Sequence, residues 1–163
     1  MRTRVQAFPQ GVAFWLRKPA LPPPYLTELI AWFENLTLQT LDQIDTIYAP
    51  RARFKDPFND VEGLPAIRHV FHHMFHQVDA PRFRITDTFW NGQGAMVLWT
   101  FEFIARRPLP RQFFTIQGTT HFLFDAAGKV NMHRDYWDTA EELYAKLPLL
   151  GTVVKKLLRL GRA

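Results

Sequence analysis

Two aspartates and one histidine are the side chains best placed by their pattern to move protons. Asp56 shares the apolar face of a short alternating strand with Phe54, and in the last predicted strand Asp135 shares a face with His133 and Trp137. A carboxylate beside aromatic rings gains basicity because burial disfavours its charged form, and histidine titrates near neutral pH. These positions predict general acid–base chemistry on a hydrophobic compound.

Each of these residues also has a structural interpretation. Asp56 precedes a proline, so the alternative is that it ends the strand and accepts hydrogen bonds from turn amides. The alternative for Asp135 is an ion pair with Arg134 or Arg53, and for His133 a place in the wall of the core. Both interpretations stay open at the level of sequence.

Other kinds of chemistry are less consistent with the composition. The 163 residues include no cysteine, which excludes thiolate metal sites, disulfides and a cysteine nucleophile. His69, His72, His73 and His76 form one stripe of a predicted helix, opposite its apolar residues, and no second cluster of ligands follows a recognisable spacing. We therefore predict a solvated stripe, no metal and no cofactor.

The basic charge lies at the two ends of the chain. Residues 1–24 and 152–163 each carry four basic residues and no acidic one, whereas the formal net charge of the whole chain is +5. A nucleic-acid surface would need basic residues interleaved with aromatics on the folded body, so no nucleic-acid partner is expected. The apolar run Val12–Leu16 is too short for a signal peptide, and no run approaches a membrane span, which predicts a cytoplasmic protein.

Periodicity and turn residues divide the chain into helices followed by strands. One domain is expected over 25–138, after a basic proline-rich arm (1–24) and before a basic helical segment (139–163). The predicted helices are Tyr25–Gln39, Leu41–Tyr48, Leu64–Val78, Thr139–Lys146 and Gly151–Arg159, and the predicted strands are Arg51–Asp56, Arg82–Trp90, Ala95–Ala105, Gln112–Phe124 and Lys129–Asp138. This order implies an α+β fold with helices on one face of a curved sheet.

Two motifs in this framework resemble the nuclear-transport-factor-2-like superfamily, in its SnoaL-like and ketosteroid-isomerase-like branch. The motifs are Ile47–Pro57, followed by Gly63 and Ala66-Ile67-Arg68, and Thr120–Val130, and the segment His133–Asp138 is also similar to SnoaL-like proteins. The resemblance implies a cone-shaped curved antiparallel β-sheet wrapped by three N-terminal helices, plus a C-terminal helix, with a small-molecule pocket inside the cone.

The resemblance also implies roles for individual residues. Asp56 stands where ketosteroid isomerase, a worked example of pKa tuning, has its general base. Trp32 and Thr120 stand where that enzyme has the two acidic donors of its oxyanion hole, so a ketosteroid isomerase is not expected. Asp135 resembles the acid–base aspartate of SnoaL-like cyclases, with His133 as a partner base. The implied ligand-binding residues are Trp32, Thr120, Trp99, Val97, Phe101, Ile116, Gly118, Phe122 and Trp137, with Gly118 leaving room for a ligand.

These expectations favour a cofactor-free isomerase, cyclase or lyase acting on a small hydrophobic carbonyl compound. A non-catalytic binder of a small hydrophobic molecule and a protein-interaction module are the alternatives. The resemblance further implies a homodimer formed through the outer face of the sheet, which would include Phe113, Thr115, Gln117, Thr119, His121 and Leu123.

The end of the chain is basic and amphipathic. An apolar stripe of Leu150, Val153, Val154, Leu157 and Leu158 lies among four basic residues. Such a helix caps the mouth of the cone, packs on a partner subunit, or makes a weak peripheral contact with an anionic membrane, to which the basic N-terminal arm would add.

Overall fold

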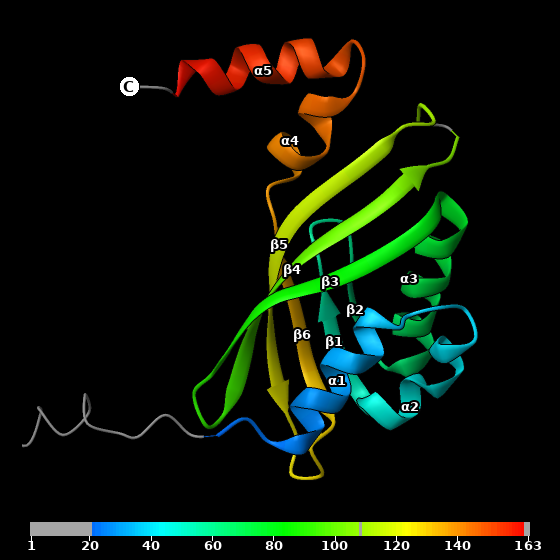
Figure 1. The fold of residues 1–163 in the computed structure, drawn as a ribbon, viewed down its shortest axis with the longest axis vertical. Helices are drawn as coiled ribbons and strands as arrows, with labels where there is room; N and C mark the ends of the chain where they lie inside the picture. The colour runs from blue at the N-terminus through cyan, green and yellow to red at the C-terminus, as the bar shows by residue number, and fades with distance from the viewer. Residues whose placement is uncertain (1–20, 108, 162–163) are drawn as a thin grey trace, which may run out of the picture.

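A computed structural model describes residues 21–107 and 109–161. Most of the predicted N-terminal arm, residues 1–20, lies outside the described residues. The elements are α1 (Pro24–Glu34), η2 (Thr40–Gln43), α2 (Ile44–Ile47), β1 (Tyr48–Lys55), β2 (Asp60–Glu62), α3 (Leu64–Gln77), β3 (Val78–Trp90), β4 (Gly94–Ala105), β5 (Phe113–Phe124), β6 (Val130–Tyr136), α4 (Thr139–Glu142), η3 (Tyr144–Lys146) and α5 (Leu150–Leu160). Helices α1, α2 and α3 cover one side of a strongly curved sheet, and α5 projects from the far end (Figure 1).

The sheet has six strands in the order β2-β1-β6-β5-β4-β3. The predicted α+β fold, with helices around a curved sheet, is confirmed. One detail of it needs correction, because β1 pairs with β6 in parallel while the other neighbours are antiparallel. The short β2 is not predicted from the sequence. It is held against β1 by ion pairs that Asp60 makes with Arg53 and Lys55, at 2.9 and 2.7 Å.

The first helix ends earlier than its apolar period predicts. Pro24 occupies the first turn, where its missing N–H costs nothing, and Leu26, Leu29 and Trp32 are buried. After Glu34, threonine hydroxyls accept backbone N–H groups that would otherwise form helical hydrogen bonds. Thr37 and Thr40 each accept the other's backbone N–H through their hydroxyl oxygens. The chain then turns through η2 and α2 into β1.

Two clusters of buried apolar side chains fill the concave side of the sheet. The larger lies between the sheet and helices α1–α3, and it includes Phe33, Phe54, Phe71 and Phe122. The smaller cluster lies toward the other end of β4 and β5. Three residues that follow β6 in the chain pack against it: Trp137, Leu143 and Leu147. The segment around α4 and η3 therefore caps this end of the concave face.

The pairing of β4 with β5 settles which residues share the concave face. Val97 lies opposite Thr120, Trp99 opposite Gly118 and Phe101 opposite Ile116. The residues predicted for the outer face, from Phe113 to Leu123, have the opposite parity and lie on the convex side. The homodimer through that side stays a prediction. None of the helices in the described ranges is long and apolar enough to cross a membrane.

Candidate functional site

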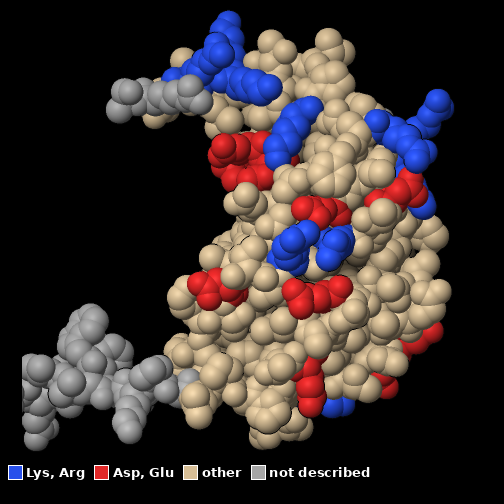
Figure 2. All heavy atoms as spheres, in the orientation of Figure 1, with Lys and Arg blue, Asp and Glu red and all other residues tan. Residues whose placement is uncertain are grey.

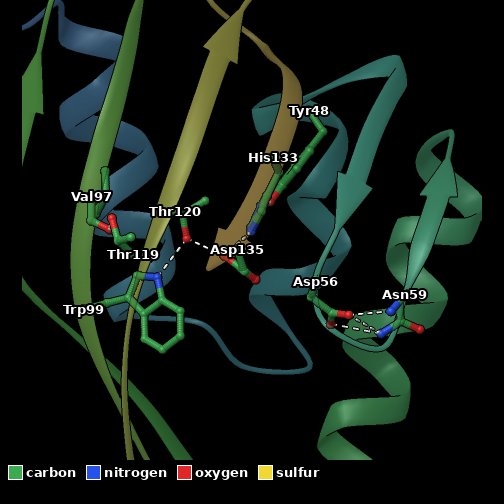
Figure 3. Close-up of polar contacts among 9 residues, drawn as sticks. All are labelled: Tyr48, Asp56, Asn59, Val97, Trp99, Thr119, Thr120, His133 and Asp135. Atoms are coloured by element: carbon green, nitrogen blue, oxygen red, sulfur yellow. Dashed lines mark hydrogen bonds and ion pairs between the residues drawn. The ribbon is translucent and has the colours of Figure 1, made fainter. Parts of the chain in front are cut away.

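Asp135 is the meeting point of a chain of polar contacts that runs across the concave face. It lies on β6 opposite Thr120 of β5, whose hydroxyl donates to Asp135 Oδ1. The same oxygen lies 2.9 Å from Nε2 of His133. Figure 3 shows the carboxylate between these two partners, with Thr120 on one side and the imidazole on the other. Its side chain keeps 17% exposure.

His133 lies deeper in the fold than Asp135. Its side chain is 2% exposed, and its Nδ1 lies 2.7 Å from the hydroxyl of Tyr48 at the start of β1. Aromatic rings surround the imidazole, with ring centroids 4.4 Å away for Phe54 and 4.8 Å away for Phe122. The packing fixes the orientation of the ring, so Nε2 stays directed at Asp135.

Trp99 extends the chain on the other side of Asp135. Its indole N–H donates to Oγ1 of Thr120 at 2.7 Å. The indole lies directly over Gly118, and a Cβ at that position would overlap its Cζ2 and Cη2 atoms. The expectation that Gly118 leaves room for a ligand is therefore wrong, since the indole of Trp99 occupies the space.

The donors along this chain all point toward Asp135. An ionised carboxylate can only accept, so His133 donates from Nε2 and, in its neutral form, accepts at Nδ1 from the hydroxyl of Tyr48. Burial, and then the charge of Asp135, raise the pKa of Tyr48 well above its usual value, which keeps the phenol in its donating form. Within the described residues no buried side-chain nitrogen or oxygen lacks a partner.

The raised pKa of Tyr48 predicts a loss of stability in alkali that Tyr48→Phe removes. The unfolded chain releases the phenolic proton near pH 10, whereas the folded protein holds it, so stability falls as pH rises above about 10 by up to about 1.4 kcal/mol per pH unit. Tyr48→Phe lacks this loss, although it costs about 1–3 kcal/mol near pH 8 because Nδ1 of His133 loses its donor. Urea denaturation of both proteins between pH 8 and pH 11 measures the difference, and parallel pH profiles would contradict the assignment.

An open cleft of about 530 Å³ gives Asp135 access to solvent. It lies where the ends of β1 and β6 separate. Its lining residues are Lys55, Asp56 and Pro57 on one side and Arg134, Asp135, Tyr136, Trp137 and Asp138 on the other. Among the described residues, Asp135 is the one that both lines the cleft and belongs to the chain of polar contacts. A molecule in the cleft would therefore meet this chain at Asp135.

Asp56 lines the same cleft, but both of its carboxylate oxygens are engaged in a turn. Oδ1 accepts the backbone N–H groups of Phe58 and Asn59 at 2.7 and 2.5 Å. The side-chain amide of Asn59 donates to Oδ1 at 3.0 Å and to Oδ2 at 2.9 Å. The structure favours the turn interpretation of Asp56 over its role as the base, since protonation would disrupt these bonds (Figure 3).

Several predicted ligand-binding residues belong to the core instead. The indole N–H of Trp32 donates to the carbonyl oxygen of Thr40 at 3.1 Å, and its ring packs edge-on against Phe71. Trp32 therefore does not reach the cleft. The other predicted wall residues share the concave face and pack in the two clusters of buried side chains; these are Val97, Trp99, Phe101, Ile116 and Phe122. Trp137 does line the cleft.

Tyr48 is the site residue that sequence reasoning missed. The sequence predicts Tyr48 at the end of a helix, whereas β1 begins there. Alternation counted back from Phe54 does not place the phenol, because the pairing of β1 with β6 is irregular between Tyr48 and Arg53 and Pro50 is exposed. Only the structure shows that Tyr48 is buried on the same side as Phe54.

Comparison with known families agrees with this fold. The chain belongs to the SnoaL-like domain family, whose model matches residues 29–133. This confirms the resemblance seen in the motifs. A search of curated protein sequences returned no significant match.

Solved structures share the architecture at low identity. A nuclear-transport-factor-2-like protein of unknown function from Burkholderia pseudomallei has 18% identity and a TM-score of 0.63, over 72% of this chain and 92% of that one. A protein with a ketosteroid isomerase-like fold from Catenulispora acidiphila, in complex with trimethylamine, has 15% identity and a TM-score of 0.64, over 78% and 94%. An LEH-like epoxide hydrolase from M. tuberculosis has 18% identity and a TM-score of 0.59, over 82% and 93%. At these identities the likeness shows the fold alone.

Proposed function

We propose that this SnoaL-like protein is an enzyme that uses Asp135 as a general base and acid on a small hydrophobic carbonyl compound. The reaction class is isomerisation, cyclisation or elimination, in which a proton leaves a carbon beside the carbonyl group. The observation that carries the proposal is the chain of donors from Tyr48 and Trp99, which ends on a carboxylate that lines an open cleft.

The two oxygens of Asp135 have different surroundings. Oδ1 accepts from Thr120 and His133, whereas within the described residues Oδ2 accepts no hydrogen bond. Oδ2 is therefore the atom that takes the proton from the substrate carbon and returns it to the product. Thr120 and His133 hold the carboxylate in place, which is the positioning that proton transfer requires.

The cleft offers groups for the rest of a carbonyl substrate. Trp137 and Pro57 give it apolar surface, which suits a hydrophobic body. The guanidinium of Arg134 lies 4.8 Å from the ring centroid of Tyr136, and both residues line the cleft. Arg134 lies opposite His121 of β5 and alternates with Asp135 along β6, so its side chain lies on the convex side of the sheet, away from the carboxylate of Asp135.

A non-catalytic binder of a small hydrophobic molecule is the second candidate. It is favoured by the engagement of both oxygens of Asp56 in a turn, since this leaves one carboxylate fewer for acid–base chemistry. A binder would take a ligand into the cleft and release it unchanged. The difference between the candidates is thus whether a proton of the ligand exchanges.

Proton exchange with solvent tests the proposal directly. The purified protein is incubated in D₂O with tetralone, indanone and cyclohexenone, and deuterium entry beside the carbonyl is followed by NMR. Exchange above the buffer rate supports the acid–base proposal. In parallel, native mass spectrometry and organic extraction of the freshly purified protein identify any small molecule that is bound to it. A hydrophobic molecule that binds the protein but shows no exchange of its own protons would favour the binder and overturn the enzyme.

A further inference from the structure

Helix α5 exposes an apolar face that no other described part of the chain, within 21–107 and 109–161, covers. It projects from the end of the molecule and packs mainly on η3 (Figure 1). The side chains of Val153 and Leu157 are 56% and 60% exposed, and the one buried residue of the helix is Gly151. Leu149, Leu150, Leu158 and Leu160 are also exposed large apolar residues. The expected capping of the cone is thus done by the segment before α5, not by α5 itself.

The base of this helix is fixed to the sheet. Lys146 of η3 donates to the carbonyl oxygen of Thr115 on β5 at 2.7 Å, and Gln112 donates to the carbonyl oxygen of Lys146 at 3.2 Å. At the first turn of α5, a Cβ on Gly151 would come within 2.5 Å of the carbonyl oxygen of Ala145. Gly151 permits this close approach, and its backbone N–H donates to the carbonyl oxygen of Leu147 at 2.8 Å, so the first turn of α5 packs directly on η3.

Charge and apolar surface are separated around α5. At about 100° per residue, the aliphatic side chains from Leu150 to Leu160 fall within one half of the helix. Lys155, Lys156 and Arg159 fall on the other half, and no acidic residue follows Glu142, which is paired with Lys146 at 2.9 Å. In Figure 2 the projecting helix carries basic side chains and no acidic ones.

We propose that α5 binds the surface of an anionic membrane, with its aliphatic half inserted among the acyl chains and its basic half facing the lipid headgroups. An aliphatic face backed by cations is the pattern of interfacial helices. The loop between β4 and β5 lies at the same end of the molecule and exposes Arg107 and Arg111, and Phe113 at the start of β5 is exposed beside it. These side chains would add to the same contact.

A second copy of α5 is a less suitable partner. Two copies packed through their aliphatic faces would leave Lys155, Lys156 and Arg159 of each on the outer halves of the pair. These cations would gain no partner there, because the helix carries no acidic residue. Anionic headgroups provide the opposite charge that a second copy lacks.

Vesicle sedimentation tests the membrane contact. The full chain is mixed with sucrose-loaded vesicles of phosphatidylcholine, alone or with phosphatidylserine at about one lipid in three. Binding to the phosphatidylserine vesicles, weakened by salt, is expected. Lys155→Gln with Lys156→Gln should weaken it about 30-fold, at about tenfold per 1.4 kcal/mol and about 1 kcal/mol per charge. Leu157→Gln should also weaken it, because it interrupts the aliphatic face.

A matched control separates the helix from general charge. Arg82→Gln with Arg84→Gln changes the net charge by the same amount on β3, and it should leave vesicle binding within about threefold of the wild type. Equal weakening by both pairs, or no binding by the wild type, would overturn the proposal. The proposal would also be overturned if light scattering gave Leu157→Gln a lower particle mass than the wild type. That result would mean that a second copy covers this face in the wild type. The test is independent of proton exchange at Asp135.

Discussion

Asp135→Asn is expected to lower the exchange of carbonyl-adjacent protons by about 100-fold or more while the protein stays folded. General acid–base catalysis commonly contributes about 10²–10⁴-fold, and an amide at this position cannot take up the proton. The fold should tolerate the change, since Oδ1 of asparagine can still accept from Thr120 and His133. The amide nitrogen then takes the place of Oδ2 in the cleft. NMR exchange rates and thermal unfolding of the two proteins measure both effects.

Asp56→Asn is the matched control for this experiment. It removes one carboxylate charge from the same cleft, but asparagine can still accept the backbone N–H groups of Phe58 and Asn59. Exchange should therefore stay within about threefold of the wild type, an estimate for a residue that positions a turn and takes no part in proton transfer. The opposite pattern, with Asp56→Asn inactive and Asp135→Asn active, would make Asp56 the base. Loss of folding in Asp135→Asn would instead make Asp135 a structural residue.

The elements and their faces could be predicted from sequence because they follow from period and turn chemistry. Alternation put Trp99, Gly118 and Thr120 on one face, and the pairing of β4 with β5 agrees with it. The parallel pairing of β1 with β6 could not be predicted in this way, since the period of a strand carries no information about which neighbour it meets. That pairing brings Phe54 beside His133, and the same two strands bring Tyr48 within hydrogen-bonding distance of it.

The position of the cleft was harder to predict than the face of each residue. Parity shows that a side chain points into the cone, but it does not show how much volume the rings there occupy. Trp32 illustrates the limit, because counting along the helix put it near the pocket, whereas its N–H is bound to Thr40 in the core. Asp56 illustrates another, since the sequence left its turn and catalytic interpretations open and only the geometry shows both of its oxygens engaged. Asp135 lines the same cleft, and within the described residues its Oδ2 accepts no hydrogen bond.

Gly118→Ala is expected to destabilise the fold by about 3 kcal/mol. Overpacking of a core typically costs about 1–3 kcal/mol, and the loss of a buried hydrogen bond adds about 1–3 kcal/mol. Both costs apply here, because the new methyl group overlaps the indole of Trp99 and displaces the N–H that donates to Thr120. In an ordinary strand the same change would be mildly favourable, since glycine is the more flexible residue in the unfolded chain. Urea denaturation gives the difference in the free energy of unfolding.

A double-mutant cycle with Trp99→Phe identifies the cause of this destabilisation. The phenyl ring lacks the atoms that would overlap the methyl group, and it has no N–H to displace. In that background Gly118→Ala should cost less than about 1 kcal/mol, which gives a coupling of about 2 kcal/mol between the two positions. An equal cost in both backgrounds would mean that Gly118 is required by its backbone. A large coupling would mean that the indole of Trp99 positions Thr120, and through Thr120 the carboxylate of Asp135. Proton exchange should then fall in Gly118→Ala as well.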